Sequence, residues 1–115
     1  MISPRRDESL DVYGLIRQAI ERKQQVLGFY HGYYREMCPH AIGLNKRSEP
    51  QALFYQFAGG SSRPLGPPAS PQNWRCIRID DLSNVSLRDG EWHTASDHRS
   101  NETCVFQRLD LSVTP

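Results

Sequence analysis

The chain has 115 residues, the usual size of one domain and too short for two. Its 14 basic and 13 acidic side chains leave it almost neutral, whereas a dedicated duplex-DNA binder carries a basic excess that neutralises phosphates. Any nucleic-acid role must therefore depend on a local cluster of arginines and not on the net charge.

Residues 1 to 8 are polar, carry no apolar run of the kind that secretory signals need, and are predicted to be flexible. No stretch of the chain is apolar for long enough to span a bilayer. The three cysteines, Cys38, Cys76 and Cys104, are an odd number at wide spacings, unlike a disulfide framework. These features predict a cytoplasmic protein with free thiols and no membrane association.

The first regular element is an amphipathic helix, expected to begin at Ser9, a residue type that caps helix N-termini. Apolar residues then recur at helical spacing, with charged side chains on the opposite face. A helix of this kind covers one face or end of a sheet. A DNA-recognition role is disfavoured, because no second helix completes a helix-turn-helix. The apolar face consists of Val12, Tyr13, Ile16, Ala19 and Ile20.

After the helix the apolar pattern changes to a period of two, which predicts short antiparallel strands. The dipeptide His31-Gly32 is expected to turn the first strand into the second, and Pro39 marks an edge or a bend. One helix and five or six short strands predict a single, mainly β domain over residues 9 to 115, built as a small curled sheet or open barrel. Strands are expected at residues 26–31, 33–40 with a continuation to 44, 51–57, 74–80, 82–87 and 105–113.

The stretch from residue 59 to residue 72 is dense in Gly, Ser and Pro and is predicted to lack regular structure. A linker would need a domain on each side, for which the chain has no room. A long loop inside a compact domain is either a functional lid or a disordered excursion. The sequence leaves both alternatives open.

The sequence contains little that indicates catalysis or metal binding. Cys38 and His40 lie two residues apart, and His93 and His98 lie five apart, which are not the spacings that bring two zinc ligands onto one tight turn. No Gly-x-Ser-x-Gly elbow marks a nucleophile, and no Gly-rich phosphate loop is present. We therefore expect no enzyme activity, no metal and no cofactor. Cys38 and His40 are the pair that an enzyme would have to use.

Arginine and aromatic side chains on the predicted strands are the remaining candidates for a binding site. Guanidinium groups bind carboxylate or phosphate through paired hydrogen bonds, and aromatic faces stack on flat ligands or bases. Core packing or surface solvation accounts for any one of these residues, so the prediction rests on their combination. The set is Tyr30, Tyr33, Tyr34, Arg35, Tyr55, Trp74, Arg75 and Arg78.

Three blocks of sequence, in this order, resemble the WYL domain family. They are Tyr30 with Arg35 and Pro39, then Leu53-Phe54-Tyr55-Gln56, then Trp74-Arg75-Cys76-Ile77-Arg78-Ile79-Asp80-Asp81-Leu82, which is similar to the family's Arg-x-Phe-Arg-Leu-Asp-Arg-Ile segment. The likeness spans residues 12 to 90 and is carried by the order and spacing of the blocks. The chain departs from the family at residues 52 to 55, which lack the Trp-Tyr-Leu triplet, and at Asp81, which replaces a basic residue.

The resemblance implies an SH3-like (Sm-like) open barrel and a sensor role, as in bacterial regulators whose WYL domain follows a winged helix. The chain has no room for that helix, so a transcriptional role is not implied. By position, the basic and aromatic pocket residues of the family correspond to Tyr30, Arg35, Arg75 and Arg78, to which we add Trp74.

The expected function is thus non-catalytic binding of a small anionic ligand, such as a nucleotide or a short single-stranded nucleic acid. The alternative is a homo-oligomeric protein-interaction barrel, for instance a homodimer, whose aromatic side chains form the interface.

Overall fold

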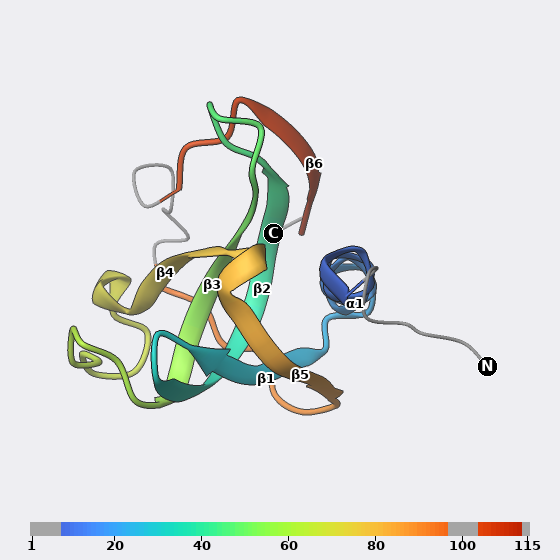
Figure 1. Cartoon of the computed structure of the whole chain (residues 1–115). Coiled ribbons are helices and arrows are strands. Elements are labelled where there is room, and N and C mark those ends of the chain that lie inside the picture. Colours follow the sequence, from blue (N-terminus) through green and yellow to red (C-terminus); the bar gives the residue numbers. More distant parts are fainter. Residues whose placement is uncertain (1–7, 97–103, 114–115) are drawn as a thin grey trace.

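The computed structural model describes residues 8–96 and 104–113. Within these ranges one helix, α1 (Glu8–Arg22), precedes six strands (Figure 1). Of the segment expected to be flexible, residues 1 to 7 lie outside the described part, and Glu8 opens α1. Ser9, the expected cap, lies inside the first turn, which is within the usual uncertainty of a helix boundary. The strands are β1 (Gln25–Tyr30), β2 (Tyr33–Leu44), β3 (Pro50–Gly59), β4 (Trp74–Arg78), β5 (Leu82–Arg88) and β6 (Arg108–Ser112).

The strands form one antiparallel sheet in the order β4-β3-β2-β1-β5, and β6 pairs with β2. A 3-10 helix, η3 (Ile79–Asp81), turns the chain out of β4 so that β5 returns to pair with β1. This connectivity is that of a small SH3-like open barrel, and it confirms the predicted mainly β architecture with one N-terminal helix. The strand expected over residues 74–80 ends at Arg78 because η3 begins there.

Strand β2 organises the sheet. One of its edges pairs with β3, whereas the other pairs with β1 as far as Met37 and with β6 from Ala41 onward. Pro39 lies where this second edge changes partner and next to a shift in the β2–β3 register. Because proline has no backbone N–H to donate, the gap between two partners is a place where a strand tolerates it. The expected irregularity at Pro39 is confirmed.

The β1–β2 hairpin is closed by the two residues expected to turn it. His31 and Gly32 have φ angles of 50° and 84°. Two-residue hairpin turns of type I′ require a positive φ at both central positions, which glycine adopts without steric cost. The turn therefore sets the register in which Tyr30 faces Tyr33.

Two groups of buried side chains lie on opposite faces of β3, as the alternation of a strand requires. The main core, to which Ala52 and Phe54 belong, packs between the sheet and α1 (Figure 1). A smaller cluster, which includes Leu53, Tyr55 and Trp74, lies on the other face.

The prediction of three free thiols is wrong for two of them. Cys76 in β4 and Cys104, which precedes β6, form a disulfide, and Cys38 is free and buried. The two bonded residues are 28 positions apart, and they meet because both segments approach the smaller cluster. An odd number of cysteines leaves at least one thiol over; it does not exclude a bond between the others.

The last strand is shorter than expected. β6 begins at Arg108 instead of at residue 105, because it pairs with β2 only up to Leu44, where β2 ends. The preceding residues contact the sheet in another way: the carbonyl of Val105 accepts a hydrogen bond from Gln51 Nε2 at 2.7 Å. Part of the loop expected over residues 93 to 103, including His98, lies outside the described residues.

Candidate functional site

Two of the predicted arginines are buried, which is unusual for a charged side chain. Arg35 on β2 is 4% exposed and Arg75 on β4 is 6% exposed. Burial, followed by the nearby positive charges of Arg63 and Arg35, lowers the pKa of Arg75 from 12.5 to about 10. The positive charge of Arg35 is the smallest of the three causes of this shift. Strand β3 lies between the two strands that carry the buried arginines.

Arg35 is held by neutral groups and by aromatic rings. Its Nη1 donates to Gln56 Oε1 at 3.3 Å, and its Nη2 donates to the carbonyl of Tyr30 at 3.1 Å. The guanidinium carbon lies 5.1 Å from the ring centre of Tyr30 and 5.7 Å from that of Tyr33, within cation–π range. Gln56 Nε2 donates in turn to the carbonyl of Gly60 at 2.9 Å. Arg35 is thereby connected to the start of the Gly/Pro-rich loop.

Arg75 fixes the backbone of that loop. Its Nη1 donates to the carbonyls of Gln72 at 2.8 Å and Trp74 at 3.0 Å, and its Nη2 donates to the carbonyl of Arg63 at 2.9 Å. The Nη2 of Arg63 donates in return to the carbonyl of Trp74 at 2.8 Å. These bonds give the loop a defined path along β4. Of the two alternatives that the sequence leaves open, the disordered excursion is the one they disfavour.

No carboxylate of the described residues balances the two buried charges. Within the described part of the chain, neither arginine forms an ion pair, and the Nε of each is buried without a hydrogen-bond partner. Buried charges are normally paired, because desolvating an unpaired ion costs several kcal/mol. Arg35, Arg63 and Arg75, called the arginine cluster below, thus form a cationic site without an anion.

Trp74 does not belong to the arginine cluster. Its side chain points to the opposite face of β4 from Arg75, into the smaller cluster. There its ring makes edge contacts with Tyr55, at 5.1 Å between ring centres, and with His40, at 4.8 Å. Trp74 is 2% exposed, so its position is that of a core residue.

Arg78 is exposed and its charge is paired, because its Nη2 lies 2.9 Å from Glu49 Oε2. Its backbone N–H is 3.5 Å from the hydroxyl of Tyr30, but its guanidinium reaches the β2–β3 turn instead of the arginine cluster. Of the five predicted site residues, the structure thus brings Tyr30 and Arg35 into contact, and Arg75 is buried on the other side of β3.

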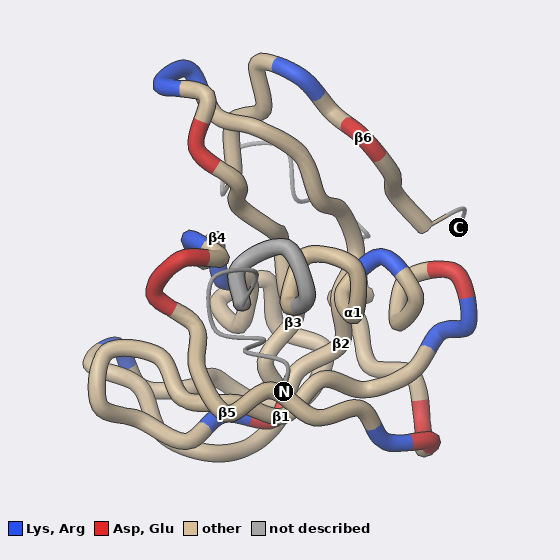
Figure 2. Tube along the Cα trace, turned by 45° about the vertical axis from the view of Figure 1, so that its right-hand side comes forward, with Lys and Arg blue, Asp and Glu red and all other residues tan. Residues whose placement is uncertain are grey.

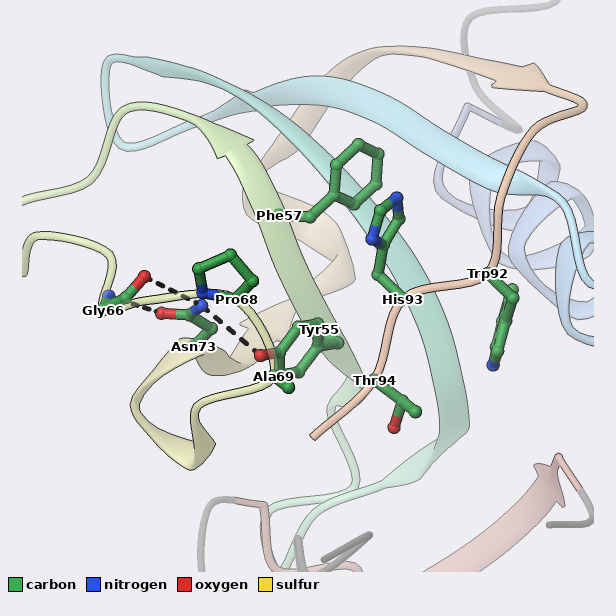
Figure 3. A pocket seen from close by; sticks show the side chains of 9 residues that line it. All are labelled: Tyr55, Phe57, Gly66, Pro68, Ala69, Asn73, Trp92, His93 and Thr94. Carbon is green, nitrogen blue, oxygen red and sulfur yellow. Dashed lines mark hydrogen bonds between the residues drawn. The ribbon is translucent and has the colours of Figure 1, made fainter. Parts of the chain in front are cut away.

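A pocket of about 430 Å³ lies on the other face of β3, beneath the loop (Figure 3). The loop does cover a cavity, then, but the cavity is lined by aromatic and small residues and not by Arg35 and Arg75. Sequence reasoning missed this pocket; the aromatic pair Trp92-His93, in a segment read as a plain loop, was its available signal. We call it the aromatic pocket, lined by Tyr55, Phe57, Gly66, Pro68, Ala69, Asn73, Trp92, His93 and Thr94.

The Cys38–His40 pair does not activate a nucleophile. Burial raises the pKa of the Cys38 thiol from 9.0 to about 11, although a hydrogen bond from the backbone N–H of His93, at 3.2 Å, lowers it slightly. A reactive thiol needs a lowered pKa and access to solvent. The Nδ1 of His40 lies 3.0 Å from the carbonyl oxygen of Cys38. This geometry gives Cys38 the properties of a buried structural thiol.

Charged residues of both signs alternate along the chain. Lys and Arg are spread along the chain and interleave with Asp and Glu (Figure 2). In the described ranges, no group of three or more His, Cys, Asp and Glu is arranged to hold a metal ion. The same ranges hold no helix of the length and apolarity that a membrane crossing requires.

Comparison with known proteins finds no matching family model, no similar curated protein and no similar solved structure. The resemblance to the WYL family therefore stays a prediction from the sequence. The arginine cluster and the aromatic pocket are the structural features from which a function can be inferred.

Proposed function

We propose that the chain is a non-catalytic binding module that takes a small anionic ligand at the arginine cluster. The observation that carries the proposal is the pair of buried guanidinium groups, Arg35 and Arg75, whose partners are all uncharged. A bound phosphate or carboxylate would supply the missing counter-charge and accept hydrogen bonds from guanidinium groups. Arg35 and Arg75 are also two of the four pocket residues that the WYL resemblance implies.

A ligand that combines a phosphate with a flat ring fits the surroundings best. Tyr33 exposes 39% of its surface beside the guanidinium of Arg35, so it offers an aromatic ring next to a cation. Nucleotides and short single-stranded nucleic acids present this combination, because their bases stack on aromatic side chains while arginine contacts the backbone. The near balance of 14 basic and 13 acidic residues disfavours duplex DNA.

Thermal unfolding in the presence of phosphate ligands tests the proposal, because a ligand that binds only the folded state raises the unfolding midpoint with its concentration. The probes are inorganic phosphate, AMP and a short oligothymidylate at constant ionic strength. We expect Arg63→Ala, which removes the exposed member of the arginine cluster, to abolish the rise. Arg47→Ala removes an equally exposed arginine from the β2–β3 turn and is expected to keep it.

Stabilisation by all three probes would identify the phosphate as the recognised group, and stabilisation by AMP or the oligonucleotide alone would assign part of the affinity to the base. Equal losses in the Arg63 and Arg47 variants would show unspecific charge attraction and contradict the site. No stabilisation by any of the probes would contradict the proposal itself.

Self-association is a second candidate function, favoured by an exposed aromatic pair on the β1–β2 hairpin. Phe29 and Tyr34 are 41% and 40% exposed, and their ring centres are 5.5 Å apart. Size-exclusion chromatography with light scattering is expected to give the mass of a dimer for the unmodified chain. The Phe29→Ser variant is expected to give the mass of a monomer. A monomer mass for the unmodified chain at high concentration would exclude this candidate.

A cytoplasmic location is also part of the proposal, and the Cys76–Cys104 disulfide makes it testable. Disulfides rarely persist in a reducing cytosol. Alkylation of thiols in intact cells, followed by mass spectrometry, is expected to label both residues if the protein is cytoplasmic. Complete protection of both would indicate an oxidising compartment.

A further inference from the structure

We infer that the aromatic pocket is a second binding site, which takes a planar, uncharged aromatic or heteroaromatic small molecule. It is separate from the arginine cluster, because Tyr55 and Phe57 line it from the face of β3 opposite to Gln56, which binds Arg35. The inference rests on the walls of the pocket and is independent of the proposed anion site.

The loop wall of the pocket is fixed by hydrogen bonds that are already made. The hydroxyl of Tyr55 donates to the carbonyl of Ser70 at 2.8 Å and accepts from Asn73 Nδ2 at 3.4 Å. The Oδ1 of Asn73 accepts from the N–H of Gly66 at 2.7 Å, and its Nδ2 also faces the carbonyl of Pro67 at 3.3 Å. A pocket whose walls are held in this way is pre-formed, so a ligand loses little affinity to ordering them.

The opposite wall is aromatic. Phe57 at the end of β3 and His93 stack with 4.1 Å between ring centres and an angle of 20° between planes. Figure 3 shows them across the pocket from Pro68 and Asn73. The backbone N–H of Ser96 donates to the carbonyl of Ala69 at 3.0 Å and ties the two walls together. The space between them is bounded by ring surfaces on one side and by the proline-rich loop on the other.

The chemistry of the lining selects the class of ligand. No Asp or Glu lines the pocket, so a cationic ligand would find no counter-ion there, and no Lys or Arg is present to attract an anion. The amide of Asn73 is occupied by the loop, so the available lining consists of the aromatic rings and the Thr94 hydroxyl, which is buried and has no hydrogen-bond partner among the described residues. Aromatic side chains prefer offset or edge contacts with other flat rings. The volume, about 430 Å³, is in the range of small-molecule sites.

Titration of the full chain with indole, followed by amide chemical shifts, tests the inference. Indole is planar and uncharged, and cyclohexanol serves as a non-planar apolar control. We expect saturable shifts confined to the amides of Gly66, Ala69, His93 and Thr94 with indole, and at least tenfold weaker binding of cyclohexanol. Inorganic phosphate is expected not to displace indole, because the arginine cluster lies on the other face.

Phe57→Leu keeps an apolar side chain in place but removes the flat ring, and it is expected to weaken indole binding about tenfold or more, as the loss of an aromatic stacking partner does. Phe29→Leu makes the same change on the exposed hairpin and should leave the affinity unchanged. His93→Ala is a second variant, away from the core, with the same expected loss as Phe57→Leu. Unchanged affinity in both pocket variants, equal binding of cyclohexanol, or no saturable shifts would each overturn the inference.

Discussion

At the scale of single residues, burial decides the chemistry more than residue type does. Arg35 and Arg78 are both arginines on strands, yet one is 4% exposed and lacks a carboxylate among the described residues, while the other is exposed and bonded to Glu49. The proposed anion site therefore includes the first arginine and not the second. The same distinction separates the buried thiol of Cys38 from a reactive one.

The pH dependence of stability should report the burial of Cys38. Its folded-state pKa is raised from 9.0 to about 11, so the unfolded chain loses this proton first as the pH rises. Stability should therefore fall between pH 9 and pH 11, by about 2–3 kcal/mol from this group. Denaturant unfolding of the unmodified chain and of Cys38→Ala at several pH values checks this; the variant should show a smaller fall. Parallel curves for the two proteins would contradict it.

At the scale of elements, α1 combines a well-packed face with an exposed helical glycine. Ile16 is fully buried in the main core, whereas Gly14 is exposed and a Cβ built on it meets nothing within 4 Å. The helix is thus held by tertiary packing in spite of a residue that lowers its intrinsic propensity.

Gly14→Ala is expected to stabilise the fold by about 0.5–1 kcal/mol, because alanine loses less backbone entropy in a helix and nothing obstructs its methyl group. Ile16→Ala, two residues away, should instead cost about 2–5 kcal/mol through the cavity that it leaves. Chemical denaturation of both variants measures the two effects. A destabilising Gly14→Ala would show that the helix has a neighbour at this position.

The side-chain hydrogen bonds between α1 and β6 converge on one carboxylate. Asp110 accepts hydrogen bonds from Tyr13 Oη and from Arg17 Nη1, both at 2.7 Å. These bonds lower the pKa of Asp110, and the bond from Arg17 contributes most. The stabilisation that they give is therefore fully present above pH 3.8, the ordinary pKa of the group. It is lost as the pH falls through the lowered pKa of the folded state. Asp110→Asn should therefore be less stable than the unmodified chain at neutral pH and equally stable in strong acid. A pH-independent difference between the two would contradict the ion pair.

At the scale of the whole molecule, the disulfide joins β4 to the segment that leads into β6. Because Cys76 and Cys104 are 28 residues apart, the bond restricts a long loop of the unfolded chain. The bond also lies in the smaller cluster, which includes Ala95 from the segment that follows Thr94 of the aromatic pocket.

Removing the bond with Cys104→Ser is expected to cost about 2–4 kcal/mol of unfolding free energy. Reductant should lower the stability of the unmodified chain by a similar amount and leave the variant unchanged. Cys38→Ser is the matched control, because it removes the free thiol and should keep the response to reductant. Insensitivity of the unmodified chain to reductant would show that Cys76 and Cys104 are not bonded in solution.

The sequence by itself determined the local structure. The spacing of Val12, Ile16 and Ala19 predicts the helix, the period-two pattern predicts the strands, and His31-Gly32 and Pro39 predict the turn and the irregularity in β2. These predictions succeed because a helix or a strand imposes its own repeat on neighbouring residues. The strand boundaries near η3 and β6 were less well predicted, because they depend on where a partner strand ends.

Only the tertiary structure decided which of the candidate residues share a site. Alternation along residues 74 to 80 already separates Arg75 from Trp74, but strand pairing places Arg75 and Arg35 on either side of β3, and neither forms an ion pair with a carboxylate of the described residues. The disulfide and the aromatic pocket likewise join segments that are far apart in the chain. The physical reason is that periodicity reports the geometry of one segment, whereas distances between segments follow from sheet register and packing.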